Sequence, residues 1–436
     1  MSAAVKSVYV DMPQGISTHS FLRGEDAILG LPQLLQENFP GKTPWVVADE
    51  NTWKAAGAKA FELLKEAGMD PAEPYIYPGT PRLHPDYALA EKLAAVMPEN
   101  AVPVAVGSGV INDMVKTAAG INNVTYCCVA TACSVDGYTA AGSAMTVNGS
   151  KKTVPCPAPY AICADTSILA TAPEDMFASG YADLLAKVPA GADWLIADAM
   201  GEAPVWKDVW ALIQGPLKDQ VSDSSNMMKI FTGLASTGYA MQMMKDSRPA
   251  SGAEHLFSHV WEMEGLQLNG EDISHGFKVG VGTLASTLLL EYIAKHDIKD
   301  LMPRMKPVPT VEERQKEVDE LLKRGCYGAG PRETAMQKLL TGEAGAKRRE
   351  EIISKWDHLG TLIKGQIFSS DKIRESLRTA KCPALPAEIG LDAEQFTHGI
   401  LTAQLIRIRY TCLDLLFEVG LLEDAVAYVA AHMEGE

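Results

Sequence analysis

The chain has 436 residues, 47% hydrophobic and 22% charged, a composition typical of globular proteins and a length that predicts two domains. Its formal charge of −16 argues against a nucleic acid or an anionic membrane as partner, since either needs a net basic surface. Eight cysteines without a CxxC pair, no apolar signal stretch, and no segment near the roughly twenty apolar residues that span a bilayer predict a reduced, cytoplasmic protein.

Short apolar segments alternate with helical patterns through the first 165 residues. Pro32 fits only the first turn of a helix, so the first helix is expected to begin later than its pattern does. Strands that alternate with helices on short loops indicate a mostly parallel sheet covered on both faces, and predict an α/β domain over residues 1–165. The predicted strands are 45–49, 75–77, 102–106, 126–130 and 160–164, and the predicted helices 25–38, 53–67, one ending at 91–97, and 110–119.

Helical periodicity dominates after residue 165, where strand-like runs are nearly absent. The second domain, residues 166–436, is therefore expected to be all-α, with the active site in the cleft between the domains. Its predicted helices are 174–187, 204–213, 226–244, 252–264, 275–294, 312–324, 333–340, 348–364, 393–418 and 422–433.

The first candidate site is the strand–loop–helix junction that begins at Gly107-Ser108-Gly109. Glycines after a strand let the backbone approach a pyrophosphate, and the helix that follows offers free N–H groups. Asn112 stands where the dinucleotide fingerprint has its last glycine, so a plain tight turn remains the alternative. An acid that could bind a ribose ends an earlier strand, at Asp49.

The second candidate site is the segment 131–137, Thr-Ala-Cys-Ser-Val-Asp-Gly, which follows the strand predicted at 126–130. It places hydroxyl groups and an acid at the carboxyl end of a strand, where open α/β sheets bind ligands. The same composition is also typical of a capped turn.

Three of the nine histidines lie close together in the sequence: His255, His259 and His275. Because His255 and His259 are four residues apart, they share one face of a helix. Neutral imidazole is a common ligand of catalytic metals, whereas the alternative is that these are partly buried polar residues. The zincin motif is absent, because Leu256 rather than a glutamate follows His255.

Asp183 lies on an otherwise apolar helical face of leucines and alanines. A buried acid needs a cation or hydrogen-bond donors, although an ordinary surface pair with Lys187 is the alternative. Together with His255 and His275, Asp183 would form a three-ligand site with an open position, as Lewis-acid metals have.

Five further motifs carry a family resemblance: TACSVDG at 131–137, PYAICADT at 159–166, SGYADLLAK at 179–187, RPASGAEH at 248–255 and SHGFKVGVGT at 274–283. Together they resemble the sn-glycerol-1-phosphate dehydrogenase family, in the superfamily of iron-containing alcohol dehydrogenase, glycerol dehydrogenase and dehydroquinate synthase. The similarity covers nearly the whole chain, and SRPASGAEH is its most specific segment.

The resemblance implies an N-terminal nucleotide-binding domain, a helical C-terminal domain, and NAD(P)-dependent interconversion of dihydroxyacetone phosphate and sn-glycerol 1-phosphate. It also implies site residues. Carried over by motif, the metal ligands are Asp183, His255 and His275; the substrate contacts are His259 and Asp136, with Asp183 nearby; and the cofactor contacts are Asp49, Gly107, Ser108, Gly109, Val110, Ile111, Thr131, Ala132, Cys133 and Ser134.

The implied ligands are NAD or NADP, one divalent metal and a small phosphorylated triose. Two imidazoles and a carboxylate suit zinc, nickel and iron alike. Asp49 slightly favours NAD, because an acid there binds a free ribose diol. Arg248 and Lys278 are candidates for the phosphate, or else ordinary surface charges. A homo-oligomer, a dimer or larger, is expected.

The chain departs from the family pattern in four places. Ser108 takes the middle of three glycines, Ala140 stands where a cofactor-contacting serine is usual, and Tyr181 replaces a glycine. The stretch 295–350 is longer than expected and reads as an insertion. The alternative functions are a glycerol or other polyol dehydrogenase, a lyase-type relative with bound NAD, and a non-catalytic cofactor-binding protein.

Overall fold

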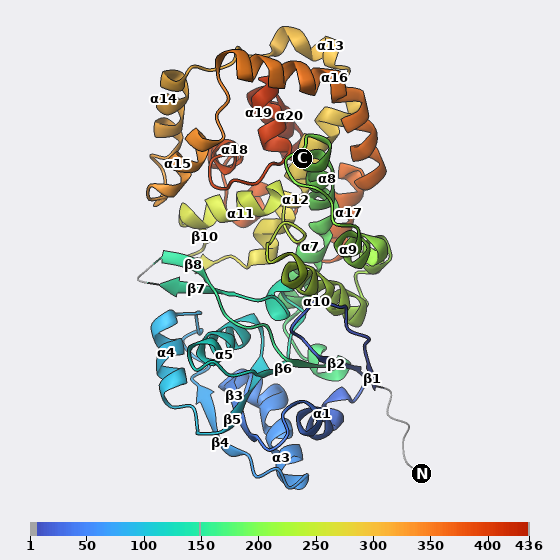
Figure 1. The fold of residues 1–436 in the computed structure, drawn as a ribbon, viewed down its shortest axis with the longest axis vertical. Coiled ribbons are helices and arrows are strands. Elements are labelled where there is room, and N and C mark those ends of the chain that lie inside the picture. Colours follow the sequence, from blue (N-terminus) through green and yellow to red (C-terminus); the bar gives the residue numbers. More distant parts are fainter. Residues whose placement is uncertain (1–6, 148–149, 435–436) are drawn as a thin grey trace. The chain divides into compact units, whose positions relative to one another are not determined.

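The computed structural model describes residues 7–147 and 150–434. The chain forms two compact units (Figure 1). One comprises Met1–Leu184 and Asp219–Asp246, and the other Leu185–Lys218 and Ser247–Glu436. The boundary predicted after residue 165 and the roles given to the two domains stay predictions.

A seven-stranded sheet organises the first unit, in the order β1-β2-β9-β6-β5-β3-β4. Only the edge pair β1 and β2 is antiparallel, and every other neighbour runs parallel, as predicted. The strands are β1 Ser7–Tyr9, β2 Ser20–Gly24, β3 Thr43–Asp49, β4 Ala72–Tyr77, β5 Ala101–Gly107, β6 Cys127–Ala130 and β9 Ala161–Asp165; β7 Ser143–Val147 and β8 Ser150–Val154 form a separate hairpin.

Helices pack against the sheet in two groups. Helices α1 and α3 share a buried cluster with the strands that includes Leu35, Val46 and Val104, whereas α4, α5 and the β7–β8 hairpin pack together. The predicted α/β architecture is therefore correct. The helices are α1 Leu31–Asn38, α2 Glu50–Thr52, α3 Ala58–Glu66, α4 Tyr87–Ala95, α5 Gly109–Ile121, α6 Thr166–Leu169, α7 Glu174–Leu185 and α10 Met227–Met244, with short turns η1 Ala27–Gly30, η2 Trp53–Gly57 and η3 Asp136–Tyr138.

The chain reverses its direction across the sheet between β3 and β5. From β3 it passes to β4 on one side, and then returns to β5 on the other. At such a switch point the loops after the two strands diverge and leave a crevice at their carboxyl ends, the usual ligand site of open α/β sheets. Asp49 ends β3 and Gly107 ends β5, so both border this point.

Some elements of the first unit differ from their predictions. All five predicted strands are present, but β1, β2, β7 and β8 were not predicted, because their mixed polar residues carry no buried apolar run. The predicted helix 25–38 is a short turn, η1, followed by α1, which begins at Leu31 with Pro32 in its first turn, as expected.

The second unit is helical, as predicted, and α12 lies at its centre. This helix packs against α8, α11, α16, α17 and α20. By length and composition α12 could cross a membrane, so the expectation that no segment qualifies is wrong, yet 94% of its apolar window is buried inside the protein. The helices are α8 Lys187–Ala199, α9 Lys207–Gln220, α11 Ala253–Met263, α12 His275–Lys295, α13 Ile298–Leu301, α14 Val311–Leu321, α15 Gly330–Gln337, α16 Gly342–Gln366, α17 Ser370–Thr379, α18 Ala393–Ala403, α19 Cys412–Val419 and α20 Leu422–Met433.

The predicted helix 393–418 is wrong, because the chain leaves the helical path between α18 and α19. Thr411 begins α19 as its N-cap, and the carbonyl of Tyr410 accepts a hydrogen bond from Arg248 Nη1 at 2.7 Å. Helices α8 and α17 were not predicted. Asn269 and Gly270, a residue pair whose sequence is typical of a tight turn, both have positive φ and join β10 Gln267–Leu268 to β11 Glu271–Asp272.

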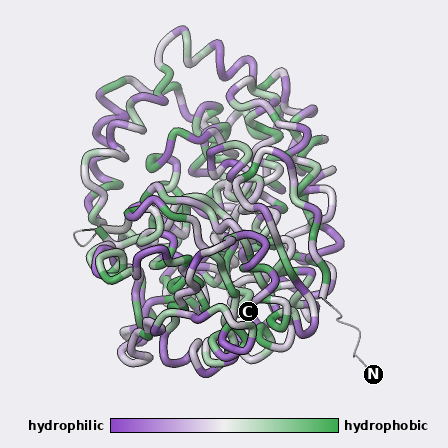
Figure 2. Tube along the Cα trace, turned by 60° about the horizontal axis from the view of Figure 1, so that its bottom comes forward, coloured by the Kyte–Doolittle hydropathy of each residue, from purple (hydrophilic) through white to green (hydrophobic). Residues whose placement is uncertain are grey.

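The stretch 295–350 folds into helices, and two of them, α14 and α15, share a small core with the segment that follows α18. Val318, Ala335 and Leu405 form that core, and the buried Arg314 stacks on the ring of Phe417. Hydrophobic and hydrophilic residues are interspersed along the chain, as the trace coloured by hydropathy shows (Figure 2). The stretch is thus an ordered part of the second unit.

Candidate metal and nucleotide site

Asp183 lies near the end of α7 and is fully buried. Its position follows from close packing one turn earlier, where a Cβ on Gly180 would lie 2.0 Å from the carbonyl oxygen of Cys133. This approach brings α7 against the segment after β6. There the backbone N–H of Asp136 donates to Asp183 Oδ2 at 2.9 Å. One oxygen of the buried carboxylate is therefore held by a backbone donor.

His255 lies in the first turn of α11 and is 5% exposed. Its Nδ1 atom lies 2.7 Å from Oε1 of Glu254, which is itself fully buried. The same Oε1 accepts the backbone N–H of Gly252 at 2.7 Å. Because the carboxylate accepts a hydrogen bond from a proton-bearing Nδ1, it favours the tautomer that carries its lone pair on Nε2, the form in which an imidazole binds a metal.

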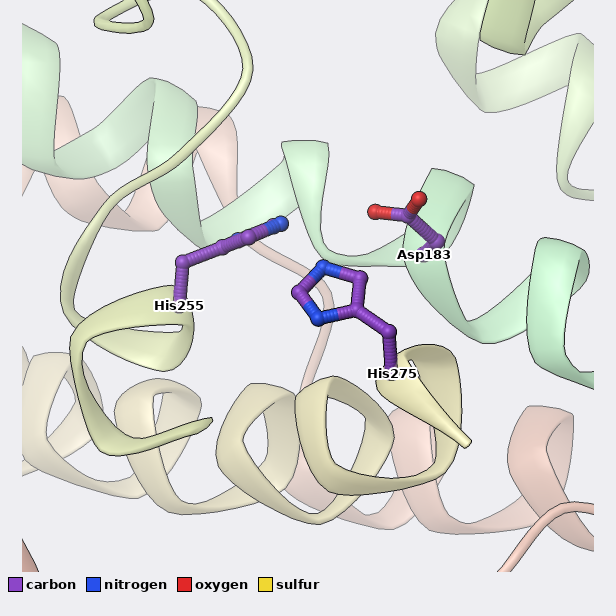
Figure 3. Close-up of side chains that lie close together, drawn as sticks. All are labelled: Asp183, His255 and His275. Carbon is purple, nitrogen blue, oxygen red and sulfur yellow. The ribbon is translucent and has the colours of Figure 1, made fainter. Parts of the chain in front are cut away.

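His275 is the first residue of α12, after Ser274 caps the helix with a hydrogen bond to the N–H of Phe277. Its Nδ1 atom lies 3.8 Å from Oε1 of Glu262, within ion-pair range but too far for a hydrogen bond. Lys278 Nζ binds the same Oε1 at 2.8 Å. The other ring nitrogen, Nε2, points toward Asp183 and His255 (Figure 3).

Asp183, His255 and His275 form one group, in which each side chain offers one ligand atom and all these atoms lie within 4.8 Å of one another. Figure 3 shows the two imidazoles and the carboxylate turned toward a common point. Two nitrogens and one oxygen at this spacing fit a transition metal with an open position. The alternative for Asp183, a surface pair with Lys187, is wrong, because both residues are fully buried.

His259 is not a member of this group, although its ring centroid lies 6.3 Å from that of His275. Its Nδ1 atom lies 3.7 Å from Oε2 of Glu262. Burial lowers the pKa of the His259 imidazole, outweighing the opposing effect of Glu262. Burial alone would raise the pKa of Glu262, but His259, His275 and Lys278 hold it well below its usual range. Glu262 is thus a carboxylate shared between two imidazoles and a lysine.

The predicted cofactor residues lie at the carboxyl ends of three neighbouring strands. Gly107 ends β5 and permits a close turn, because a Cβ there would lie 2.4 Å from that of Ile111. Thr131, just after β6, donates its N–H to the carbonyl of Gly107 at 3.1 Å. Gly107, Ser108, Gly109, Val110 and Ile111 therefore lie beside Thr131, Ala132, Cys133 and Ser134 at one edge of the sheet.

Asp49 caps a helix at the same edge of the sheet. Its Oδ1 accepts the N–H groups of Asn51 and Thr52 at 2.9 and 2.8 Å, and it caps α2. Asp49 still lies at the end of β3, the position expected for a ribose contact. That contact stays a prediction.

The structure shows the surroundings of two residues that depart from the family pattern, Tyr181 and Ala140. The hydroxyl of Tyr181 donates to the carbonyl of Val221 at 2.8 Å, and the ring is buried in the protein interior. Ala140 is buried. Of the candidates for phosphate, Arg248 donates to Tyr410, and Lys278 binds Glu262 and the carbonyl of Ile273.

Sequence reasoning missed the carboxylates behind the histidines, Glu254 and Glu262, and also Asp193. The fully buried Asp193 accepts the N–H groups of Ala253 and Cys412, both at 2.7 Å. It therefore holds the first residues of α11 and α19. Glu254 could have been found from its place beside His255, whereas no local signal points to Asp193, whose partners lie 60 and 219 residues away.

Known proteins resemble this chain in sequence and in fold. A sequence profile of the iron-containing alcohol dehydrogenase family matches residues 23–173. A glycerol-1-phosphate dehydrogenase [NAD(P)+] of Geobacillus thermodenitrificans is 28% identical over 396 residues, 87% of each chain, and one of Bacillus velezensis is 31% identical, covering 60% of this chain and 70% of the relative. The crystal structure of a probable glycerol dehydrogenase from Sinorhizobium meliloti has the same fold, with a TM-score of 0.57 at 15% identity over 94% of this chain and 96% of that one.

Proposed function

The chain belongs to the sn-glycerol-1-phosphate dehydrogenase family of NAD(P)-dependent oxidoreductases that act on CH–OH groups, and on that premise we propose that it interconverts dihydroxyacetone phosphate and sn-glycerol 1-phosphate. Asp183, His255 and His275 would hold one divalent ion, zinc, nickel or iron. The observation that carries the proposal is the grouping of these three ligand atoms within 4.8 Å.

The three ligand atoms suit a metal ion that assists the reduction of a ketone. A bound divalent ion acts as a Lewis acid and stabilises negative charge that develops on the substrate oxygen. The buried Asp183 carboxylate and the two imidazoles, each with a carboxylate near Nδ1, provide an electron-rich site for such a cation. A nicotinamide supplies or accepts the hydride, and the chain has to position it.

His259 and Asp136 would contact the substrate. The His259 side chain is 35% exposed, and burial lowers the pKa of its imidazole. An imidazole in its neutral form can donate one hydrogen bond and accept another. Asp136 lies directly beside a metal ligand, since its N–H binds Asp183. We assign both residues to orienting the substrate and moving a proton at its hydroxyl.

The dinucleotide would bind at the edge of the sheet where β3, β5 and β6 end. The switch point between β3 and β5, the N-terminus of α5 and the tight turn at Gly107 together favour a pyrophosphate there. Asp49 at the end of β3 would contact the adenosine ribose, and this favours NAD over NADP.

The proposal is tested by following NADH oxidation by the zinc-loaded protein with dihydroxyacetone phosphate. Turnover is expected, and His275→Ala should abolish both turnover and stoichiometric zinc binding. His432→Ala is the matched control, because His432 is an exposed histidine of the same unit and should leave both unchanged.

Three outcomes would contradict the proposal. Equal or faster turnover of unphosphorylated dihydroxyacetone would indicate a polyol dehydrogenase instead. Product formed without net NADH consumption would indicate a lyase that recycles its cofactor. Protein without stoichiometric metal and without turnover would indicate a non-catalytic cofactor-binding protein.

A further inference from the structure

The loop that touches the metal ligand Asp183 is fastened to the helix that begins at the nucleotide junction. This loop, residues 136–142, starts with Asp136, whose N–H donates to Asp183 Oδ2 at 2.9 Å. The helix is α5, which starts at Gly109 directly after β5. The two elements are joined by side chains of α5 that bind backbone carbonyls of the loop.

Lys116 makes most of these bonds. Its Nζ donates to the carbonyls of Gly137 and Gly142 at 2.9 and 3.1 Å, so it holds both ends of the turn that follows Asp136. The side chain is fully buried, and its charge is balanced by Asp113 at 3.5 Å, one turn earlier on α5. Burial raises the pKa of Asp113, while Lys116 opposes that rise.

Asn112 supports the same loop from the preceding turn of α5. Its Nδ2 donates to the carbonyl of Tyr138 at 3.2 Å, and its Oδ1 accepts the hydroxyl of Tyr126 at 3.1 Å. Three carbonyls of the loop are thus bound by two buried side chains four residues apart on one face of α5. Asn112 stands where the dinucleotide fingerprint has its last glycine, and its side chain makes hydrogen bonds that a glycine could not make.

We propose that Lys116, with Asn112, is a positioning residue of the metal site. By fixing the carbonyls of Gly137 and Gly142, it keeps the Asp136 N–H on one oxygen of Asp183, so that the carboxylate presents its other oxygen to the ion. A carboxylate held in this way loses little orientational freedom when the metal binds. The inference rests on the proposed function only in taking Asp183 as a metal ligand.

The test separates the carbonyl contacts of Lys116 from its ion pair. Lys116→Met alone would leave the Asp113 carboxylate, whose side chain is 20% exposed, without its cation, at a cost to stability. The variants are therefore Asp113→Asn, which retains the lysine and its carbonyl bonds, and the double variant Asp113→Asn, Lys116→Met, which removes them. Zinc affinity of the metal-free full chain is measured by competition with a chromophoric chelator.

The double variant is expected to bind zinc about 10- to 100-fold more weakly than Asp113→Asn, as loss of an outer partner of a metal ligand does. Its Co²⁺ complex should also absorb differently in the visible range, because the geometry of the Asp183 ligand changes. A substitution that only destabilised the folded protein would leave the visible spectrum of the Co²⁺ complex unchanged. Asn112→Ala, which keeps Lys116, should weaken zinc binding less than the double variant and provides the same readout if that variant does not fold.

An unchanged Co²⁺ spectrum, with zinc affinity within about twofold of the Asp113→Asn control, would overturn the inference while leaving the proposed function intact. Wild-type protein that binds no zinc would overturn both. Wild-type protein that binds zinc without turning over dihydroxyacetone phosphate would overturn only the proposed function, since the positioning of Asp183 is measured without substrate.

Discussion

His255 and Glu254 are neighbours in the chain and partners in the structure, with Nδ1 of the imidazole 2.7 Å from Oε1 of the carboxylate. Both side chains are buried, so water does not compete for this contact. The pair sets which nitrogen of His255 faces Asp183 and His275. The proposed metal site therefore depends on Glu254 as well as on its three ligands.

Glu254→Gln should lower zinc affinity by about 10- to 100-fold, because an amide selects the Nδ1–H tautomer of His255 less strongly than a carboxylate. Chelator competition on the metal-free protein measures the change. The control is Glu264→Gln, which alters another contact between a carboxylate and an imidazole, Glu264 Oε1 to His398 Nδ1 at 2.9 Å, outside the metal group. Equal zinc affinities in the two variants would refute the role of Glu254.

Asp193 should make the stability of the protein depend on pH in a predictable direction. Burial raises the pKa of this carboxyl to about 7, and the Glu254 carboxylate adds to the rise. As the pH increases from the ordinary pKa of an aspartate, the unfolded state ionises first. The contribution that protonated Asp193 makes to the free energy of unfolding at low pH is therefore lost progressively up to about pH 7. Above that pH the contribution no longer changes.

Asp193→Asn removes this ionisation. The free energy of unfolding of the wild type, minus that of the variant, should fall by about 2–3 kcal/mol between about pH 5 and pH 8. Urea unfolding at several pH values measures the difference, and other ionisable groups cancel in the subtraction. A difference that stays constant with pH would show that Asp193 titrates normally.

Gly180→Ala should destabilise the protein by about 1–3 kcal/mol, because the new methyl group meets the backbone carbonyl of Cys133. Zinc affinity should fall as well, since the contact that aligns α7 with the Asp136 loop must open. Gly365→Ala is the control, as a Cβ there has no neighbour within 4 Å in the last turn of the helix α16. That variant should be more stable by about 0.5–1 kcal/mol, and thermal unfolding compares the two.

Tyr181→Phe tests whether the departure from the family glycine is purely structural. The change deletes the hydroxyl that donates to Val221, and should cost about 1 kcal/mol of stability. Zinc affinity and the Michaelis constant for dihydroxyacetone phosphate should stay at wild-type values. A raised Michaelis constant with unchanged stability would instead place the hydroxyl at the substrate.

Local sequence patterns determined much of the fold. The buried runs at 45–49 and 102–106 became parallel strands, Pro32 marked a helix start, and Asn269-Gly270 formed its hairpin turn. Such features depend on neighbouring residues, whose backbone preferences and periodicity act over one or two turns. The family resemblance also singled out Asp183, His255 and His275, which lie together in the structure.

Only the tertiary structure decided what supports those three residues. Between α18 and α19, the carbonyl of Tyr410 accepts a hydrogen bond from Arg248, 162 residues away. Lys116 and Asp193 look ordinary in the sequence, yet they bind backbone groups far along the chain. Buried polar groups take whatever donor or acceptor the packing brings to them, and no local pattern encodes that partner.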